Sequence, residues 1–190
     1  MNTPAHGIVN LALLDRKSRA GTQVPVLVGA FAPDLPIMAF YAYERFFRSM
    51  PGAVIWSRLY YDSNWQWLFD LAHSIPLALA GFCLAFSLRA RSVGAFFLSL
   101  TLHAVGDLAL HNEDAHRHFL PLSDWRFRSP ISYWDPRHFG WLGATIEVGL
   151  VIGGSWVLLR RHASGPGRAV TIALLWIYAL GWVVAILAWG

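Results

Sequence analysis

Charged residues are scarce in this chain: only 14% of its 190 residues are Asp, Glu, Lys or Arg, whereas 56% are hydrophobic and the mean hydropathy is +0.43. This balance excludes an ordinary soluble domain, in which about 25% of the residues are charged. The apolar residues are distributed over the whole length, and the start MNTPAHGIVNLALL lacks the basic region of a removable signal peptide. We therefore predict one integral membrane domain over residues 1–190, with its first segment retained.

Cysteine and lysine are almost absent, with one residue of each. The single cysteine, Cys83, excludes an intramolecular disulfide and a CxxC metal site, and its apolar surroundings, LAGFCLAF, indicate a small buried hydrophobic residue. The net charge is +4, and the basic residues form short clusters between apolar segments. This pattern indicates a membrane topology signal, so we expect no nucleic-acid partner.

Five apolar segments are each near the roughly 20 residues that a helix needs to cross the hydrocarbon of a bilayer. They are 24–43, 65–88, 92–111, 141–160 and 169–189. A shorter apolar helix near 4–14 precedes them. The sequence therefore predicts an all-α integral membrane bundle of about five transmembrane helices plus a short N-terminal helix.

The short loops of this arrangement are basic. If all five segments cross, loops 16–21, 89–91 and 160–168 share one side and carry eight of the 15 basic residues. By the positive-inside rule these loops are cytoplasmic. The longer loops, above all 112–140, then face the exterior or periplasm. We predict a bacterial inner-membrane protein with its active site on the periplasmic side.

Three polar residues recur at one-turn spacing inside the segment 92–111: His103, Asp107 and His111. Positions i, i+4 and i+8 share one face of a helix, so three possible metal ligands point the same way. An acid near the middle of a bilayer costs about 2.5–3.5 kcal/mol, so it persists where it is paired, hydrated or bound to a cation. We therefore expect the active site on this helix face. The alternative is a buried polar network that only locks helices together.

Polar residues of other segments reach the same depth. Counted inward from the outer helix ends at about 1.5 Å per residue, the site residues of four segments lie about 9–14 Å below the outer surface. His6, on the short helix, could reach the same layer. The predicted metal ligands are His6, Asp34, His73, His103, Asp107 and Glu147.

Each of these residues also has a structural interpretation. His6 could be a polar residue near a helix start, and Asp34, beside two helix-breaking prolines in GAFAPDLP, could be a helix cap instead of a ligand or base. His73 could be a core histidine, although Asp70 one turn back could fix its tautomer as for a ligand. Glu147 could make a helix-packing hydrogen bond.

The loop 112–140 combines histidines, acids, arginines and aromatic residues. Its aromatic residues suit a lid at the level of the lipid headgroups, and its arginines offer forked donors for phosphate. The alternative is an interfacial aromatic belt with snorkelling arginines. The candidate substrate-binding residues are Arg117, Arg126, Arg128 and Trp134; the candidate catalytic residues are Asp34, His111 and Asp114.

The order of these motifs resembles that of known metal enzymes. His6, then GxxxPD ending at Asp34, then His73 in AHS, then HxxxD at His103 and Asp107, resembles the small membrane-bound metal-dependent hydrolases. It is also similar in order to the zinc-dependent phospholipase C and single-strand nuclease superfamily, over about the first three quarters of the chain. The resemblance implies an all-helical zinc cluster that cleaves phosphate esters. Asp34, His73, His103 and Asp107 would surround one ion, and Asp107 would bridge to a neighbouring ion near His6.

The chain departs from that pattern in two places. The soluble phospholipases hold a further ion with a later His and an HxxxE pair, whereas Gly143 stands four residues before Glu147 here. They also use a processed N-terminus, which a retained Met1 would not provide. A further ion would need a ligand from His111, His116, His118 or His138, so we expect one to three Zn²⁺ ions.

The sequence thus predicts a membrane-embedded zinc hydrolase, phospholipase C-like, that acts on a phosphoester of a membrane lipid or amphipathic substrate. A metal-dependent lipid amidase would use the same residues. A non-enzymatic transporter subunit or scaffold would need a polar path, whereas the runs LALAGFCLAF and GLVIGGSWVLL are nearly all apolar. No HExxH motif of a zinc protease occurs. The oligomeric state is left open.

Overall fold

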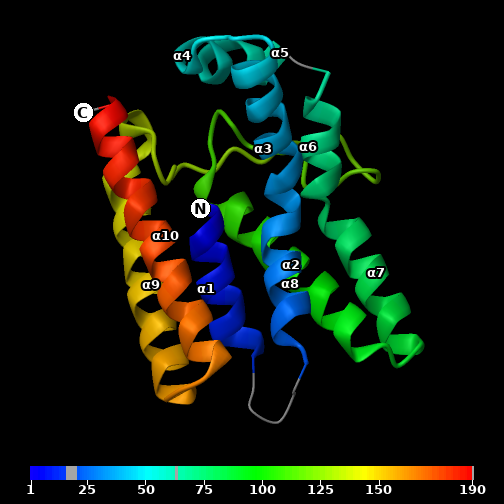
Figure 1. Ribbon diagram of the computed structural model, residues 1–190. Coiled ribbons are helices and arrows are strands. Elements are labelled where there is room, and N and C mark those ends of the chain that lie inside the picture. The colour runs from blue at the N-terminus through cyan, green and yellow to red at the C-terminus, as the bar shows by residue number, and fades with distance from the viewer. Residues whose placement is uncertain (16–20, 63, 190) are drawn as a thin grey trace.

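The computed structural model describes residues 1–15, 21–62 and 64–189, and within these ranges every regular element is a helix (Figure 1). The α-helices are α1 (Thr3–Leu14), α2 (Gln23–Phe31), α3 (Leu35–Ala42), α4 (Gly52–Val54), α5 (Tyr60–Asp62), α6 (Gln66–Ala72), α7 (Ile75–Ser87), α8 (Arg91–Leu110), α9 (Gly140–Arg161) and α10 (Pro166–Trp189). Short 3₁₀ or π turns are η1 (Ala32–Asp34), η2 (Tyr43–Phe47), η3 (Ile55–Leu59) and η4 (Pro136–His138).

Four stretches are long and apolar enough to cross a membrane: Gln23–Phe47, Arg91–Leu110, Gly140–Arg161 and Pro166–Val184. The pair α6 and α7, bent by 41°, makes a fifth if it counts as one span. The all-α bundle of about five spans with a short N-terminal helix is therefore confirmed, and its composition is compatible with a membrane protein.

The segment 65–88, predicted as one helix, is two. Ser74 caps α7 by accepting the backbone N–H of Leu77 (3.2 Å), and Pro76 in the first turn has no N–H to continue the hydrogen-bond ladder of α6. His73 therefore ends α6 and lies at the break. Asp34 lies in η1, a 3₁₀ turn between α2 and α3. The stretch Gln23–Phe47 continues through this turn, so the two prolines beside Asp34 tighten the helix but do not break it.

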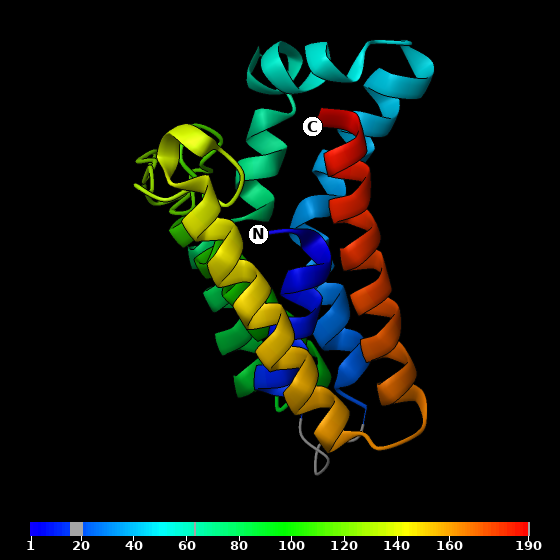
Figure 2. The ribbon, with the colours of Figure 1, turned by 90° about the vertical axis from the view of Figure 1, so that its left-hand side faces the viewer.

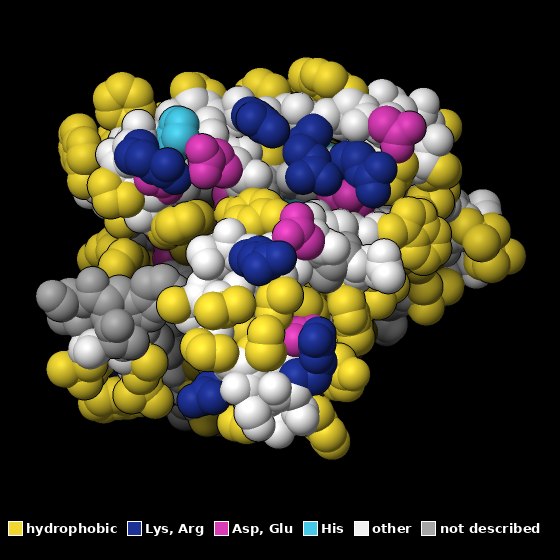
Figure 3. Space-filling view, turned by 90° about the horizontal axis from the view of Figure 1, so that it is seen from above, with side chains coloured by type: hydrophobic (Ala, Val, Ile, Leu, Met, Phe, Trp, Pro, Cys, Tyr) yellow, Lys and Arg dark blue, Asp and Glu magenta, His cyan; other side chains and the backbone are white. Residues whose placement is uncertain are grey.

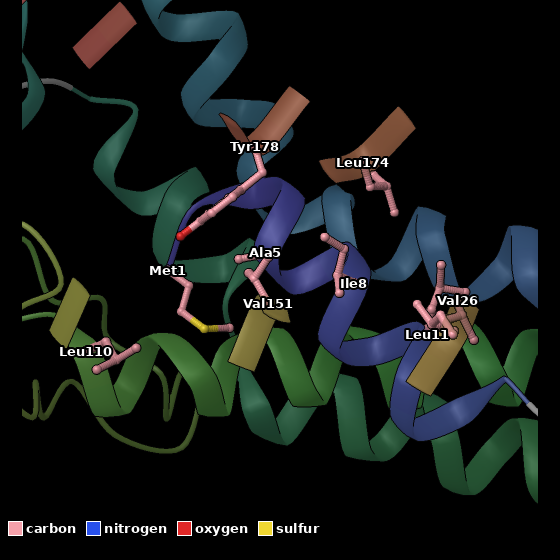
Figure 4. Packing of buried hydrophobic residues seen from close by; sticks show 10 residues of the cluster. Met1, Ala5, Ile8, Leu11, Val26, Leu110, Val151, Leu174 and Tyr178 are labelled. Atoms are coloured by element: carbon pink, nitrogen blue, oxygen red, sulfur yellow. The ribbon is translucent and has the colours of Figure 1, made fainter. Parts of the chain in front are cut away.

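The short helix α1 is the centre of the bundle, since it packs against α2, α8, α9 and α10 (Figures 1 and 2). Its buried Ile8 and Leu11 join Val26, Val151 and Leu174 in one apolar cluster (Figure 4). The first turn of α1 lies beside α8, so this helix carries its own polar residues into the interior.

The α2 and α8 backbones approach closely at Gly29. A Cβ at this position would lie 2.2 Å from the carbonyl oxygen of Phe96, so a larger residue would force the helices apart. The approach brings the carbonyl of Ala30 within 2.7 Å of the His103 ring. The glycine of the GxxxPD motif thus sets the distance between the segments that carry Asp34 and His103.

The outer faces of the long helices are apolar. Phe86, Trp176 and Leu187 are 77%, 72% and 81% exposed. Cys83 is also exposed, on α7, so the prediction that it is a buried hydrophobic residue is wrong. A helix in lipid can be apolar all round, and hydropathy then does not tell its outer face from its inner one.

The two ends of the bundle differ. The connections at 88–90 and 162–165 lie at one end (Figure 1). The third predicted basic loop is 16–21, and its residues 16–20 lie outside the described residues. The irregular stretch 111–139 lies at the other end, beside the start of α9 (Figure 2). Seen from that end, acidic and basic side chains gather on the surface, with hydrophobic side chains around them (Figure 3).

We expect the stretch 111–139 to be extracytoplasmic, because the other end carries the short basic connections. A Ser123→Cys change in a Cys83→Ser background should then react with an impermeant thiol reagent added to intact cells, since Ser123 is exposed. Ser164→Cys, exposed at the opposite end, is the matched control and should react only after lysis. The reverse labelling pattern would invert the topology.

Candidate metal centre

Four side chains from three separate segments converge within the bundle. Asp34 from η1, His73 from the end of α6, and His103 and Asp107 from α8 each offer one ligand atom, and these atoms all lie within 4.8 Å of one another. In the described parts of the chain, this is the one set of three or more His, Cys, Asp or Glu residues so arranged. His73, His103 and Asp107 are buried, and the Asp34 side chain is 15% exposed. The group could hold a metal ion.

The two histidines have their tautomers fixed by backbone carbonyls. His73 Nδ1 lies 2.8 Å from the carbonyl oxygen of Phe69, and His103 Nδ1 lies 2.7 Å from that of Ala30. A carbonyl can only accept, so each Nδ1 carries the proton. Each Nε2 is then a lone-pair donor; both are buried and without a hydrogen-bond partner. Metal-ligating histidines commonly donate the N–H of their other ring nitrogen to a carbonyl or carboxylate in this way.

Asp70 does not have the role considered for it. The partner of His73 is the Phe69 carbonyl, whereas the Asp70 carboxylate accepts hydrogen bonds from Arg117 and Arg126. The hypothesis that Asp70 fixes the tautomer of His73 is therefore wrong. The Phe69 carbonyl, one turn back on α6, accepts both the backbone N–H of His73 (3.2 Å) and its ring N–H.

The distances within the group suit a shared cation better than direct hydrogen bonds. His73 Nε2 lies 3.8 Å from Asp34 Oδ1 and 3.4 Å from Asp107 Oδ2. His103 Nε2 lies 3.6 and 3.0 Å from the same two oxygens. N–H···O bonds lie at about 2.7–3.2 Å, whereas the edges of a tetrahedron with metal–ligand bonds of about 2.0–2.1 Å measure about 3.3–3.4 Å. Three of the four distances are longer than a hydrogen bond, and the distance from His103 Nε2 to Asp107 Oδ2 falls within the hydrogen-bond range.

Asp107 links this group to a second set of polar atoms through its other oxygen. Asp107 Oδ1 accepts the amino group of Met1 (2.7 Å) and lies 2.9 Å from His6 Nε2 and 3.2 Å from His111 Nε2. The His6 ring stacks on His103, with centroids 3.7 Å apart. The structure thus brings His6 to the edge of the four-ligand group but not into it.

Glu147 is buried near this layer but outside the group. Its two carboxylate oxygens accept the backbone N–H and the side-chain N–H of Asn2, both at 3.0 Å. Its place matches the helix-packing alternative better than a ligand role, because both oxygens are already engaged.

We therefore expect Glu147→Gln to leave the metal content unchanged. The amide oxygen can still accept from Asn2, so the variant removes a negative charge with little change of packing. Elemental analysis of the purified variant checks this. If the variant lost metal in parallel with His103→Ala, Glu147 would have to be a ligand.

The candidate catalytic residues His111 and Asp114 form a pair beside Asp107. His111 Nδ1 lies 2.8 Å from Asp114 Oδ2, which also accepts the indole N–H of Trp134 at 2.9 Å. Burial disfavours the imidazolium, but the charges of Asp107 and Asp114 outweigh it and raise the pKa of His111 to about 9. Burial likewise disfavours the charged Asp114, yet His111 lowers the pKa of that carboxyl to about 2.

The arginines of the loop are largely engaged with one buried acid. Asp70 accepts the Arg117 Nε–H (2.5 Å), the Arg117 backbone N–H (3.0 Å) and an Arg126 Nη2–H (3.3 Å). Arg128 and Trp134 are exposed. Of the four predicted substrate-binding residues, the two arginines at 117 and 126 thus bond to Asp70 of α6 and hold the loop against that helix.

Two loop histidines line the inner side of the same stretch. His116 stacks on His73 with centroids 4.0 Å apart, and His118 Nδ1 donates to the His116 carbonyl (2.9 Å), which leaves His118 Nε2 buried and unpartnered. Burial lowers the pKa of His116 to about 4 and of His118 to about 3, so both are neutral at pH 7. His138 is bound to Asp135 instead (3.0 Å).

Sequence reasoning missed Thr3, whose hydroxyl donates to Asp34 Oδ2 (2.5 Å). Its position three residues before His6, on the same face of α1, was the available signal. No family model, curated protein or solved structure matches the chain. The function is therefore inferred from the residues of this chain alone.

Proposed function

We propose that the chain is a membrane-embedded zinc-dependent hydrolase that cleaves a phosphoester of a lipid or amphipathic substrate. The observation that carries the proposal is the pair of buried, unpartnered Nε2 atoms of His73 and His103, facing two carboxylate oxygens at 3.0–3.8 Å. We place the protein in a bacterial inner membrane, with this site open to the periplasmic side.

The donor set favours zinc. Two imidazole nitrogens with two carboxylate oxygens suit a borderline-soft ion, whereas Mg²⁺ and Ca²⁺ prefer oxygen ligands throughout. Catalytic zinc sites commonly have three protein ligands and one open position. His73, His103 and Asp107 are the three buried ligands here, and Asp34 is the most exposed of the four. A bound Zn²⁺ would lower the pKa of a water toward about 7 and polarise the phosphoryl group.

The side chains around the group supply the remaining chemistry in this proposal. Asp34 takes the proton of the attacking water, and Thr3 holds its Oδ2 so that Oδ1 faces the histidines. His111, paired with Asp114, provides a proton for the leaving group. Arg128 lies exposed on the loop and can neutralise a phosphate.

Transport fits the interior less well than hydrolysis does. Asn10 and Ser99 are buried on the cytoplasmic side of the site in this orientation. Asn10 Nδ2 donates to the Ser99 carbonyl (2.8 Å), and the Ser99 hydroxyl donates to the Val26 carbonyl (2.6 Å). These polar groups are paired with one another across three helices, so they close the bundle rather than line a path through it.

One experiment tests the proposal: elemental analysis of the purified protein, followed by turnover of a lipid panel with and without a chelator. We expect about one to three zinc ions per chain. We also expect release of a phosphorylated headgroup that stops on chelation and returns with Zn²⁺. Cleavage of ceramide but of no phospholipid would assign a lipid amidase. Bound zinc without any turnover would contradict an enzyme.

A further inference from the structure

His118 is a fully buried histidine of the stretch 111–139 that the proposed mechanism does not use. Its Nδ1 donates to the carbonyl of His116 (2.9 Å), so the proton lies on Nδ1 and Nε2 is an acceptor. This Nε2 is buried and has no hydrogen-bond partner in the described part of the chain, whereas His111 and His138 both contact carboxylates. Buried polar atoms are nearly always hydrogen-bonded, so His118 indicates a missing partner.

The backbone around His118 is fixed to the break between α6 and α7. The His118 carbonyl accepts the backbone N–H of Ile75 (2.9 Å), which opens α7 and has no acceptor within the helix. Two residues on, the Leu120 carbonyl accepts the Ser74 hydroxyl. The ring of His118 is in edge contact with that of His73, with centroids 6.2 Å apart. A group bonded to His118 Nε2 would therefore lie beside the metal centre.

His118 has the same tautomer as the two histidines of the metal centre but lies outside their group. His73 and His103 also bond to a carbonyl through Nδ1 and leave Nε2 buried without a partner. Among the described residues, however, His118 joins no set of three His, Cys, Asp or Glu ligand atoms within 4.8 Å. Zinc sites in proteins have three or four protein ligands. The partner that His118 Nε2 lacks is therefore a hydrogen-bond donor and not a further ion.

We propose that His118 Nε2 accepts a hydrogen bond from an O–H or N–H group of the substrate headgroup. Neither a phosphodiester nor an acyl ester has a hydrogen to donate, so the donor belongs to the headgroup. Ethanolamine, serine and glycerol carry such a donor, whereas choline carries none. The inference rests on the proposed function and narrows its substrate to a phospholipid with a donating headgroup. A buried acceptor left unpaired weakens binding, so the site should reject phosphatidylcholine.

The first test uses N-methylated lipids, because each added methyl group removes one N–H donor and keeps the positive charge. The protein is assayed in mixed micelles with phosphatidylethanolamine, its mono- and dimethyl derivatives and phosphatidylcholine. We expect kcat/KM to fall at least about tenfold at the last step, where the last N–H is lost. Equal turnover of all four lipids would mean that a buried water bonds to Nε2, and would overturn the inference while hydrolysis stands.

Two substitutions of His118 separate the acceptor from the fold. Asparagine can still donate to the His116 carbonyl but has no atom at the Nε2 position, whereas the longer glutamine can place its amide oxygen there. We expect His118→Asn to cleave dimethylated lipid and phosphatidylcholine within about twofold of each other, and His118→Gln to restore most of the preference.

Zinc content should be unchanged in both variants. His138→Gln is the matched control, because His138 is a histidine of the same stretch that bonds to Asp135 (3.0 Å), and it should keep the wild-type preference. Loss of zinc in His118→Asn would make His118 a ligand and overturn the inference. A full preference retained in His118→Asn would overturn it as well.

Binding measured without turnover keeps the inference and the proposed function apart. Non-hydrolysable phosphonate analogues of short-chain phosphatidylethanolamine and phosphatidylcholine are added to the wild-type protein in detergent, where a bound ligand raises the Tm. We expect the choline analogue to raise the Tm less than half as much as the ethanolamine analogue at the same concentration. This difference in a protein that hydrolyses no lipid would keep the donor site and refute the hydrolase. Equal shifts in an active hydrolase would overturn the donor site alone.

Discussion

Replacing Asp107 by alanine should remove the bound metal and lower lipid turnover at least about a hundredfold. Its Oδ2 faces His73 and His103, and its Oδ1 accepts from His6 and Met1. The change therefore deletes a charged ligand and leaves several polar groups facing an empty space. No other acid lies on this face of α8, so no neighbour on the helix can replace it.

Metal content and turnover must be measured on folded protein. Helicity and elution volume in detergent verify folding, and Asp107→Asn provides a variant of nearly equal size should alanine collapse the bundle. Asp62→Asn is the matched control, since that acid is 70% exposed on its own short helix. Full zinc content in both Asp107 variants would refute the site.

The parts of the centre that lie on one helix could be predicted from the sequence. His103 and Asp107 are one turn apart, so helical periodicity alone places them together. Asp34 stands beside two prolines, which predict the turn that exposes its carboxylate. The convergence of Asp34, His73 and the α8 residues followed from counting depth along helices of known rise, and the ligand distances agree with it.

The partners of these residues could not be predicted in the same way. His103 bonds to the carbonyl of Ala30 on another helix, and Glu147 bonds to Asn2 across the bundle. Every residue has a backbone carbonyl, so a sequence pattern does not show which carbonyl will accept a hydrogen bond. A buried polar side chain can also find its hydrogen-bond partner on any neighbouring helix. The sequence also did not show which acid would bind Arg117, because the loop has no periodicity from which the directions of its side chains could be predicted.

The lipid-facing surface was hard to predict for a different reason. In water, the polar face of a helix identifies the outside, whereas every face of a membrane helix can be apolar. Cys83 therefore looked buried by its neighbours but is exposed.

Replacing Asp70 by asparagine should lower the free energy of unfolding by about 2–3 kcal/mol and reduce turnover while metal stays bound. Asp70 is fully buried and binds both Arg117 and Arg126, so the change removes the buried counter-charge that the two guanidinium groups share. Loss of one partner of a fully buried pair costs about 3–5 kcal/mol, and the expected loss here is below that range because the arginine side chains are 27% and 30% exposed.

Asp124→Asn is the control, because Asp124 pairs with the same Arg117 but is 84% exposed; it should change stability by no more than about 0.5 kcal/mol. Unfolding in detergent measures both variants, and elemental analysis reports the metal. The loop held by Asp70 carries His116, which stacks on His73. Loosening the loop should therefore disturb access and positioning before it disturbs the ligands. Equal stability of the two variants would mean that Asp70 does not anchor the loop.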